Sequence, residues 1–186
     1  MNTIKNDAVN EIIINKSKFI TSIVKVKDII DCKNKLLEIK NTYKDATHNC
    51  FAYKIDNIKR FNDDKEPAGT AGMPILNVID NNDLNHVLIV VSRYFGGIKL
   101  GAGGLLRAYS SSCSECLKLC EIIEEKKYIK MKIEFDYNNL KNIDYILRDY
   151  EVTYKEYDDI ITYEFLYEEN NYPDEIDNYI ISKEAD

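Results

Sequence analysis

The sequence lacks the long apolar run that a membrane-spanning helix requires. No stretch approaches about 18 uninterrupted apolar residues, and the opening MNTIKNDAVNEIII has no basic region, apolar run or small-residue cleavage site of a secretory signal. We therefore expect a cytoplasmic protein that does not contact membranes. The composition, 45% hydrophobic and 31% charged, is typical of a folded, water-soluble chain.

Cysteine is scarce, and its number is odd. The five residues are Cys32, Cys50, Cys113, Cys116 and Cys120. In a chain long enough to bury its own core, this argues against a disulfide framework. The last three include a CxxC motif, but they fall on the apolar stripe of a predicted helix, so we interpret them as core residues rather than zinc ligands. We expect no metal and no cofactor.

Positive charge is scarce in the last third of the chain. Residues 1–120 contain 17 lysines and arginines against 13 aspartates and glutamates, whereas residues 121–186 contain 8 against 19. A polyanion would therefore meet the first part of the chain. The tyrosines that gather after Tyr128 are expected to pack in a core, because the surrounding negative charge repels a nucleic-acid backbone.

Periodicity predicts an α+β protein of two domains, residues 1–124 and 125–186. In the first domain we expect a hairpin or two strands broken near residues 15–18, and then a helix that Asp28 caps and that runs to about Tyr43. The segments that follow are a strand THNCFAYKID, a long loop over 57–72, a short helix MPILNVIDNN, a buried strand HVLIVVSRY, and a helix from Gly104 to about Glu121 with Leu106 and Tyr109 on its apolar stripe.

The second domain is predicted as strand, helix, two strands and helix. The segments are YIKMKIEFDY, NNLKNIDYILRDY, EVTYKEY, DIITYEFLYE and PDEIDNYIISKE. This βαββα order is that of a ferredoxin-like unit without its last strand.

Glycine is confined to one window, since all seven residues lie between Gly69 and Gly104. The segment GAGG follows a strand and precedes a helix, a geometry in which main-chain amides can receive an anion. A dinucleotide fingerprint would need glycine where Leu106 stands, and a Walker loop would need GK before Ser or Thr, so neither motif is present. Cations at Arg93, Lys99 and Arg107 leave open an anion-binding or partner-binding surface beside a purely structural role.

A second polar cluster holds Asp63, Asp64 and Glu66. A metal or general-base site is conceivable there, but acidic loops are more often turns whose carboxylates accept hydrogen bonds from loop amides. His48 and Cys50 share one face of a predicted strand. Their spacing does not imply a nucleophilic pair, and we favour a half-buried histidine that is satisfied by a backbone group.

The segments THNCFAYKI, DDKEPAGTAGMPIL and HVLIVVSRYFGGIKLGAGGLLRAYS together resemble the YigZ/IMPACT family, over roughly residues 17–120. The resemblance implies a first domain similar to domain IV of elongation factor G and to the βαβ fold of GHMP kinases, with a left-handed crossover. It also implies a domain after Lys126 similar to the ferredoxin-like domain V of that factor. Eukaryotic members of the family regulate translation by binding the scaffold that activates the stress kinase of initiation factor two. For bacterial members, nucleic-acid or ribosome binding is the role proposed.

The resemblance also implies a shared binding surface. Carried over to this sequence, it comprises His48, Asn49, Asp63, Asp64, Glu66, Pro67, Gly69, Thr70, Ala71, Gly72, Arg93, Tyr94, Gly96, Gly97, Lys99, Leu100, Gly101, Gly103, Gly104 and Arg107. Two departures stand out. Lys65 replaces a glycine that relatives usually carry, and the chain ends in ISKEAD, which is more helix-like than the final strand of bacterial relatives.

These observations favour a non-enzymatic binding protein linked to translation or its regulation. We expect it to contact RNA, the ribosome or a translation-associated protein, but not DNA, through the glycine-rich surface of the first domain. Two alternatives stay open. One is an enzyme acting on a small phosphorylated or carboxylate substrate, with Asp63, Asp64 or Glu66 holding a metal; the other is a protein-interaction module that binds no anion.

Overall fold

The chain folds into two units, and the computed structural model describes residues 1–185. The N-terminal unit is Met1–Glu125, and the C-terminal unit begins at Lys126. Both units combine helices with antiparallel sheets, which confirms the α+β class. Among residues 1–185, no helix combines the length and the apolar character needed to cross a bilayer.

The N-terminal unit is built on a five-stranded sheet in the order β2-β3-β6-β4-β5, in which all neighbours are antiparallel. A separate ribbon pairs β1 with β7. The elements in chain order are β1 (Asn2–Ile4), β2 (Ala8–Ile14), β3 (Ser17–Lys25), α1 (Ile29–Thr42), β4 (His48–Ile55), β5 (Ile58–Asn62), α2 (Gly72–Asn81), β6 (Val87–Tyr94), α3 (Gly101–Leu117) and β7 (Ile122–Glu124).

Local sequence explains several element ends. Asn15 and Lys16 both adopt positive φ, as a tight two-residue hairpin between β2 and β3 requires, and asparagine tolerates this conformation well. Asp28 caps α1, where its carboxylate accepts hydrogen bonds from the amides of Ile30 and Asp31. The predicted helix start at Asp28 is confirmed.

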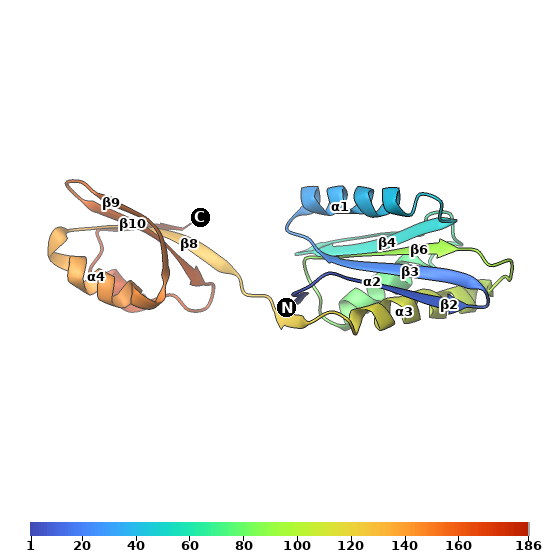
Figure 1. The fold of residues 1–186 in the computed structure, drawn as a ribbon. Helices are drawn as coiled ribbons and strands as arrows, with labels where there is room; N and C mark the ends of the chain where they lie inside the picture. The colour runs from blue at the N-terminus through green and yellow to red at the C-terminus, as the bar shows by residue number, and fades with distance from the viewer. Residues whose placement is uncertain (186) are drawn as a thin grey trace. The chain divides into compact units, whose positions relative to one another are not determined.

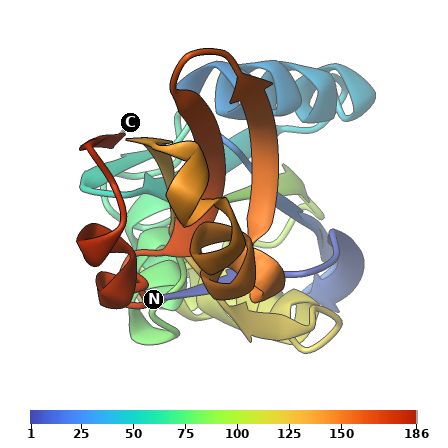
Figure 2. The same ribbon diagram turned by 90° about the vertical axis from the view of Figure 1, so that its left-hand side faces the viewer.

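Helices cover both faces of this sheet, with α1 on one side and α2 and α3 on the other (Figures 1 and 2). Strand β6 lies in the middle, and its residues from Val87 to Arg93 are all buried. The larger core lies under α2 and α3 and includes Tyr109, which no solvent reaches. The smaller core lies under α1. The last residues of β6 therefore lie between the helix α1 on one face and the helices α2 and α3 on the other.

Two predictions for this unit are wrong in detail. The predicted loop over 57–72 contains β5, whose five residues are all exposed and so lack the alternating burial that marks a strand in a sequence. Helix α3 begins at Gly101 and ends at Leu117, and its buried face contains Leu105 rather than Leu106, which is 42% exposed. Cys113 and Cys116 are buried free thiols on that face, which confirms their assignment to the core.

The C-terminal unit has a four-stranded antiparallel sheet in the order β11-β8-β10-β9. Helix α4 and short 3₁₀ segments pack on one face of it (Figure 1). The elements are β8 (Tyr128–Phe135), η1 (Tyr137–Asn139), α4 (Leu140–Ile146), η2 (Leu147–Asp149), β9 (Glu151–Tyr157), β10 (Ile161–Glu168), η3 (Asp174–Asn178) and β11 (Ser182–Ala185). Numbered within the unit, this is the strand order 4-1-3-2 of a ferredoxin-like fold.

The prediction that this unit lacks its last strand is wrong. Residues 182–185, predicted to end a helix, form β11 and pair with Met131–Glu134 of β8. The predicted helix is reduced to the 3₁₀ turn η3. All four residues of β11 are exposed, so the strand carries no hydrophobic pattern, and its formation depends on the edge of β8 about 50 residues earlier.

Candidate binding site in the N-terminal unit

A cavity of about 420 Å³ opens beside the first turn of α3. Its walls come from the start of β4, the loop between β5 and α2, the end of β6 and the loop that leads into α3. The lining residues are Thr47, His48, Glu66, Pro67, Arg93, Phe95, Lys99, Leu100, Gly101, Ala102 and Leu105. The two loops of the predicted surface, before α2 and before α3, thus meet at one hollow.

At the base of the cavity, Arg93 and Glu66 form a buried ion pair. Arg93 Nη1 donates to Glu66 Oε1 over 2.6 Å, and Arg93 Nη2 donates to Ser17 Oγ over 3.3 Å. Tyr109 donates its hydroxyl hydrogen to the same oxygen of Glu66 over 2.8 Å. Arg93 was expected on the surface, but it is 4% exposed, because it must reach the buried carboxylate.

His48 joins this cluster from the first position of β4. Its Nδ1 donates to the main-chain oxygen of Asp64 over 2.8 Å, which confirms the prediction that a backbone group satisfies it. That bond fixes the neutral tautomer, so Nε2 is an acceptor unless the ring is protonated. Nε2 lies 3.8 Å from Glu66 Oε1, within reach of an ion pair in the protonated form.

Asp63 organises the loop before α2. Its Oδ2 accepts from the amide of Gly69 over 2.9 Å, and its Oδ1 accepts from the amides of Ala71 and Gly72 over 3.0 and 2.8 Å. The amides at the start of α2 therefore already donate hydrogen bonds to a carboxylate of the same chain. An external anion would have to displace Asp63 to bind there.

Asp64 and Lys65 complete the turn of the same loop. Asp64 Oδ2 accepts from the amide of Asn49 over 2.6 Å. Asp64 and Lys65 have φ angles of 41° and 69°, so both adopt the left-handed conformation. The lysine at position 65 therefore takes up a backbone conformation that glycine adopts more easily.

The N-terminus of α3 contrasts with that of α2. Its N-cap is Leu100, and no described side chain accepts a hydrogen bond from the first amides of this helix. Lys99 is exposed immediately before it, and Arg107 is exposed one and a half turns in. A Cβ built at Gly103 would lie 3.6 Å from Arg107 Nη1, so this guanidinium reaches back over the first turn of the helix. Free amides and two exposed cations meet here.

Gly96 positions the loop that leads to α3. A Cβ at this residue would lie 2.0 Å from the main-chain carbon and oxygen of Lys16. The amide of Gly96 also donates to Ser17 Oγ over 3.2 Å. The loop thus rests directly on the β2–β3 turn, and only glycine allows this approach.

Burial controls the acidity of the side chains behind the cavity. It raises the pKa of the Cys50 thiol to about 12, although a hydrogen bond with Tyr109 acts in the opposite direction. Burial likewise raises the pKa of Tyr109, and its contacts with Cys50 and Glu66 act in the same direction. Cys50 and Tyr109 are therefore protonated at neutral pH, and Cys50 is not an activated nucleophile.

The structure brings together only part of the surface implied by the resemblance. His48, Glu66, Pro67, Arg93, Lys99, Leu100 and Gly101 line the cavity. The remaining residues do not line it but belong to the same strands, helices and connecting loops or to the start of α2: Asn49, Asp63, Asp64, Gly69, Thr70, Ala71, Gly72, Tyr94, Gly96, Gly97, Gly103, Gly104 and Arg107. Gly101, Gly103 and Gly104, expected in a strand-to-helix turn, lie in the first turn of α3.

Sequence reasoning missed four lining residues and one partner. Thr47, Phe95, Ala102 and Leu105 also line the cavity, and Ser17 holds Arg93 from a distant strand. All four lie inside the segments that carry the resemblance, Thr47 in THNCFAYKI and the other three in HVLIVVSRYFGGIKLGAGGLLRAYS, so their position was a usable signal. Ser17 gave none, because its role depends on a contact across 76 residues.

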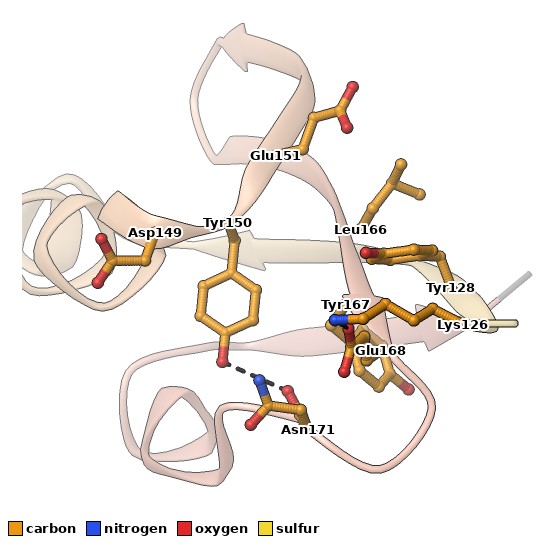
Figure 3. Close-up of a pocket in the computed structure, with 9 residues that line it drawn as sticks. All are labelled: Lys126, Tyr128, Asp149, Tyr150, Glu151, Leu166, Tyr167, Glu168 and Asn171. Carbon is orange, nitrogen blue, oxygen red and sulfur yellow. Dashed lines mark hydrogen bonds and ion pairs between the residues drawn. The ribbon is translucent and has the colours of Figure 1, made fainter. Parts of the chain in front are cut away.

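A second cavity, of about 680 Å³, lies in the C-terminal unit (Figure 3). Tyr128, Tyr150 and Tyr167 contribute rings to its walls, together with Leu166 and several polar residues. Its lining holds the carboxylates of Asp149, Glu151 and Glu168 and one cation, Lys126, which forms an ion pair with Glu168. This acidic balance repels phosphate, so we place the candidate site in the N-terminal unit.

An antiparallel sheet with helices on both faces, followed by a ferredoxin-like unit, defines a two-domain α+β protein. Comparison with known proteins gives the family. Residues 15–117 match the model of the Impact N-terminal domain. The chain is 42% identical over 172 residues to the IMPACT family member YvyE of Bacillus subtilis (strain 168), covering 90% of this chain and 79% of that protein.

A second relative, the IMPACT family member YigZ of Escherichia coli (strain K12), is 32% identical over 139 residues, covering 72% of this chain and 68% of that protein. The chain belongs to the IMPACT family. A crystal structure of a hypothetical protein is similar in fold, with a TM-score of 0.69 and 27% identity over 89% of this chain and 84% of that one.

Proposed function

We propose that the chain is a cytoplasmic, non-enzymatic binding protein connected with translation, and that it contacts RNA phosphates through the N-terminal end of α3. The link to translation rests on the family resemblance. The observation that supports an RNA contact is the uncapped start of a 17-residue helix between two exposed cations, Lys99 and Arg107.

The contrast between α2 and α3 supports this choice of element. Both helices begin next to the same group of loops. At α2 the carboxylate of Asp63 accepts hydrogen bonds from the first amides, whereas at α3 no described side chain does so. An RNA phosphate at α3 would gain amide donors and the helix dipole without displacing a protein group.

Arg93 has a different part in this proposal from the two exposed cations. Its terminal nitrogens donate to Glu66 and Ser17, so its charge is already balanced inside the unit. We assign it the role of positioning Glu66 and the loop around it. Lys99 and Arg107 then supply the charge that steers a polyanion to the site.

The enzyme alternative requires Asp63, Asp64 or Glu66 to hold a metal ion. Each of these carboxylates already has strong partners within the unit. Asp63 binds three amides, Asp64 binds the amide of Asn49, and Glu66 is shared by Arg93 and Tyr109. A metal would have to break these contacts, and this favours the binding role.

The test is the salt dependence of RNA binding by the full chain. Binding of single-stranded RNA should weaken linearly in log affinity against log salt, with a slope of about 0.7 for each phosphate contacted. The double variant Lys99→Ala, Arg107→Ala should bind more weakly and lower that slope. Lys118→Ala, an exposed cation near the other end of α3, is the matched control and should change neither.

Two results would count against the proposal. Undetectable RNA binding at low salt would exclude an RNA contact. Binding that is unchanged in the double variant would place the contact elsewhere. Capture of an acidic protein, in an interaction that the double variant loses and without RNA binding, would assign the same cations to a protein partner.

A further inference from the structure

We propose that the 420 Å³ cavity beside α3 receives one unstacked base of single-stranded RNA while the adjoining phosphate lies on the first turn of the helix. This inference rests on the proposed RNA contact and adds to it a base pocket. It therefore predicts which form of RNA binds, which a phosphate contact alone would not.

The size and walls of the cavity suit a small, weakly polar group. Its volume lies in the range of about 300–1,000 Å³ that is usual for pockets of small ligands. Phe95, Leu100, Leu105 and Pro67 give it apolar walls. An unstacked base needs such a surface, and an exposed aromatic ring like that of Phe95 is the side chain on which single-stranded bases stack.

One polar group behind these walls lacks a partner. Arg93 is 4% exposed, and no described residue accepts a hydrogen bond from its Nε. A buried donor without an acceptor is unfavourable. A ring nitrogen or carbonyl oxygen of a base would supply the missing acceptor, and an apolar ligand would not.

Phe95 lies between solvent and this donor. The carbon Cζ of Arg93 lies 5.6 Å from the centre of the Phe95 ring and 5.4 Å from that of the buried Phe19 ring, so the guanidinium packs against both. Phe95 is 46% exposed. In the proposed complex, a base that stacks on Phe95 shifts this side chain and reaches Nε.

The neighbouring charges favour a polynucleotide over a free nucleotide. Gly101 and Ala102 line the cavity and belong to the first turn of α3, so a base inside and a phosphate on the helix amides would be adjacent. Lys99 lines the cavity, and the guanidinium of Arg107 reaches back over the first turn of the helix without lining the cavity. Two exposed cations around the first turn add electrostatic attraction for a strand that carries several phosphates.

The experiment measures binding of the full chain to three probes by fluorescence anisotropy. They are a single-stranded RNA octamer, an octamer of the same length that is abasic throughout, and a duplex of the same sequence. We expect the abasic strand and the duplex to bind at least tenfold more weakly than the octamer, since neither can place a base in the cavity.

Two single-residue variants test whether the base binds in the cavity. Phe95→Ala should weaken binding of the octamer roughly tenfold without changing its salt slope, and it should leave binding of the abasic strand unchanged. Ile98→Ala is the matched control, because Ile98 is a similarly exposed apolar residue of the same loop that does not line the cavity.

The outcomes separate this inference from the function on which it rests. If the abasic strand or the duplex binds as tightly as the octamer, the base pocket is wrong and the phosphate contact stands. If none of the probes binds at low salt, the RNA function itself is wrong. If a free nucleoside monophosphate displaces the octamer at concentrations near the octamer's own Kd, the cavity serves a free nucleotide and the RNA assignment of the pocket fails.

Discussion

Arg93 Nη1 and Glu66 Oε1 lie 2.6 Å apart inside the N-terminal unit, with side chains that are 5% and 4% exposed. This contact joins the end of β6 to the loop before α2. His48 and Tyr109 meet the same carboxylate from β4 and α3. Three separate elements, β4, β6 and α3, therefore converge on Glu66, and the geometry of the candidate site depends on it.

Breaking this pair should destabilise the N-terminal unit strongly. In Arg93→Ala the carboxylate of Glu66 would lose its charged partner while remaining buried, a change that typically costs about 3–5 kcal/mol. Urea unfolding, followed through amide signals of the N-terminal unit, measures the effect without assuming that both units unfold together. Lys118→Ala breaks the exposed pair with Glu115 and should cost less than about 1 kcal/mol. Equal losses of unfolding free energy in the two variants would show that the buried pair contributes no more to stability than the exposed one.

Asp63 should be more important for the loop before α2 than its partial exposure suggests. Asp63→Ala removes the acceptor of three amide hydrogen bonds, and we expect a loss of about 2 kcal/mol, the upper end for a helix cap. Hydrogen exchange should show faster exchange at Gly69, Ala71 and Gly72. The exposed Glu38→Ala on α1 serves as the control. Unchanged protection at these amides would contradict the structural role of Asp63.

The success of the sequence predictions follows the local signal that each element carries in its own residues. Strand β6 was found because it is a continuous apolar run, and helix α1 was found because Asp28 precedes residues at helical spacing. Strands β5 and β11 were missed because every residue in them is exposed. They form because a neighbouring strand offers a free edge, a condition that no local window of sequence contains.

The site shows the same limit. The motif order located its loops, and the alternative in which Asp63 accepts hydrogen bonds from loop amides matches the structure. The burial of Arg93 was not predicted, because it depends on a carboxylate 27 residues away and on Ser17 at a separation of 76. Charge alone made Arg93 resemble Lys99 and Arg107. Its partners distinguish it from them.

Alanine substitutions at Gly96 and at Gly103 should change the stability of the N-terminal unit in opposite directions. Gly96→Ala would place its Cβ 2.0 Å from backbone atoms of Lys16, so the β6–α3 loop must move, and we expect a loss of more than about 3 kcal/mol or a failure to fold. Gly103→Ala places its Cβ near nothing closer than a flexible arginine tip, within a helix, and should stabilise the unit by up to about 1 kcal/mol. Thermal unfolding of both variants tests the contrast, and a neutral Gly96→Ala would refute the close approach.

The cysteines should differ in reactivity according to burial. Cys50, Cys113 and Cys116 have no solvent exposure, and Cys32 has 1%. Burial raises the pKa of all four, to about 11 for Cys32 and about 12 for Cys50 and Cys116. At pH 8 we expect a thiol reagent to modify the half-buried Cys120 first and the others only as the protein unfolds. Cys120→Ser should abolish the fast phase, and rapid labelling that survives this change would show that another thiol is accessible.

The same thiols should make the protein less stable in alkali. Their pKa in the unfolded chain is near 9.0, below the folded values of about 11 to 12, so above about pH 9 the unfolded state releases protons that the folded state keeps. The stabilisation is complete below pH 9 and is lost as the pH rises toward the folded values. Urea unfolding at pH 8 and pH 10 should show this decline in the free energy of unfolding. The variant Cys50→Ala, Cys116→Ala should show a smaller decline than the wild type, whereas an identical pH dependence would mean that other groups cause it.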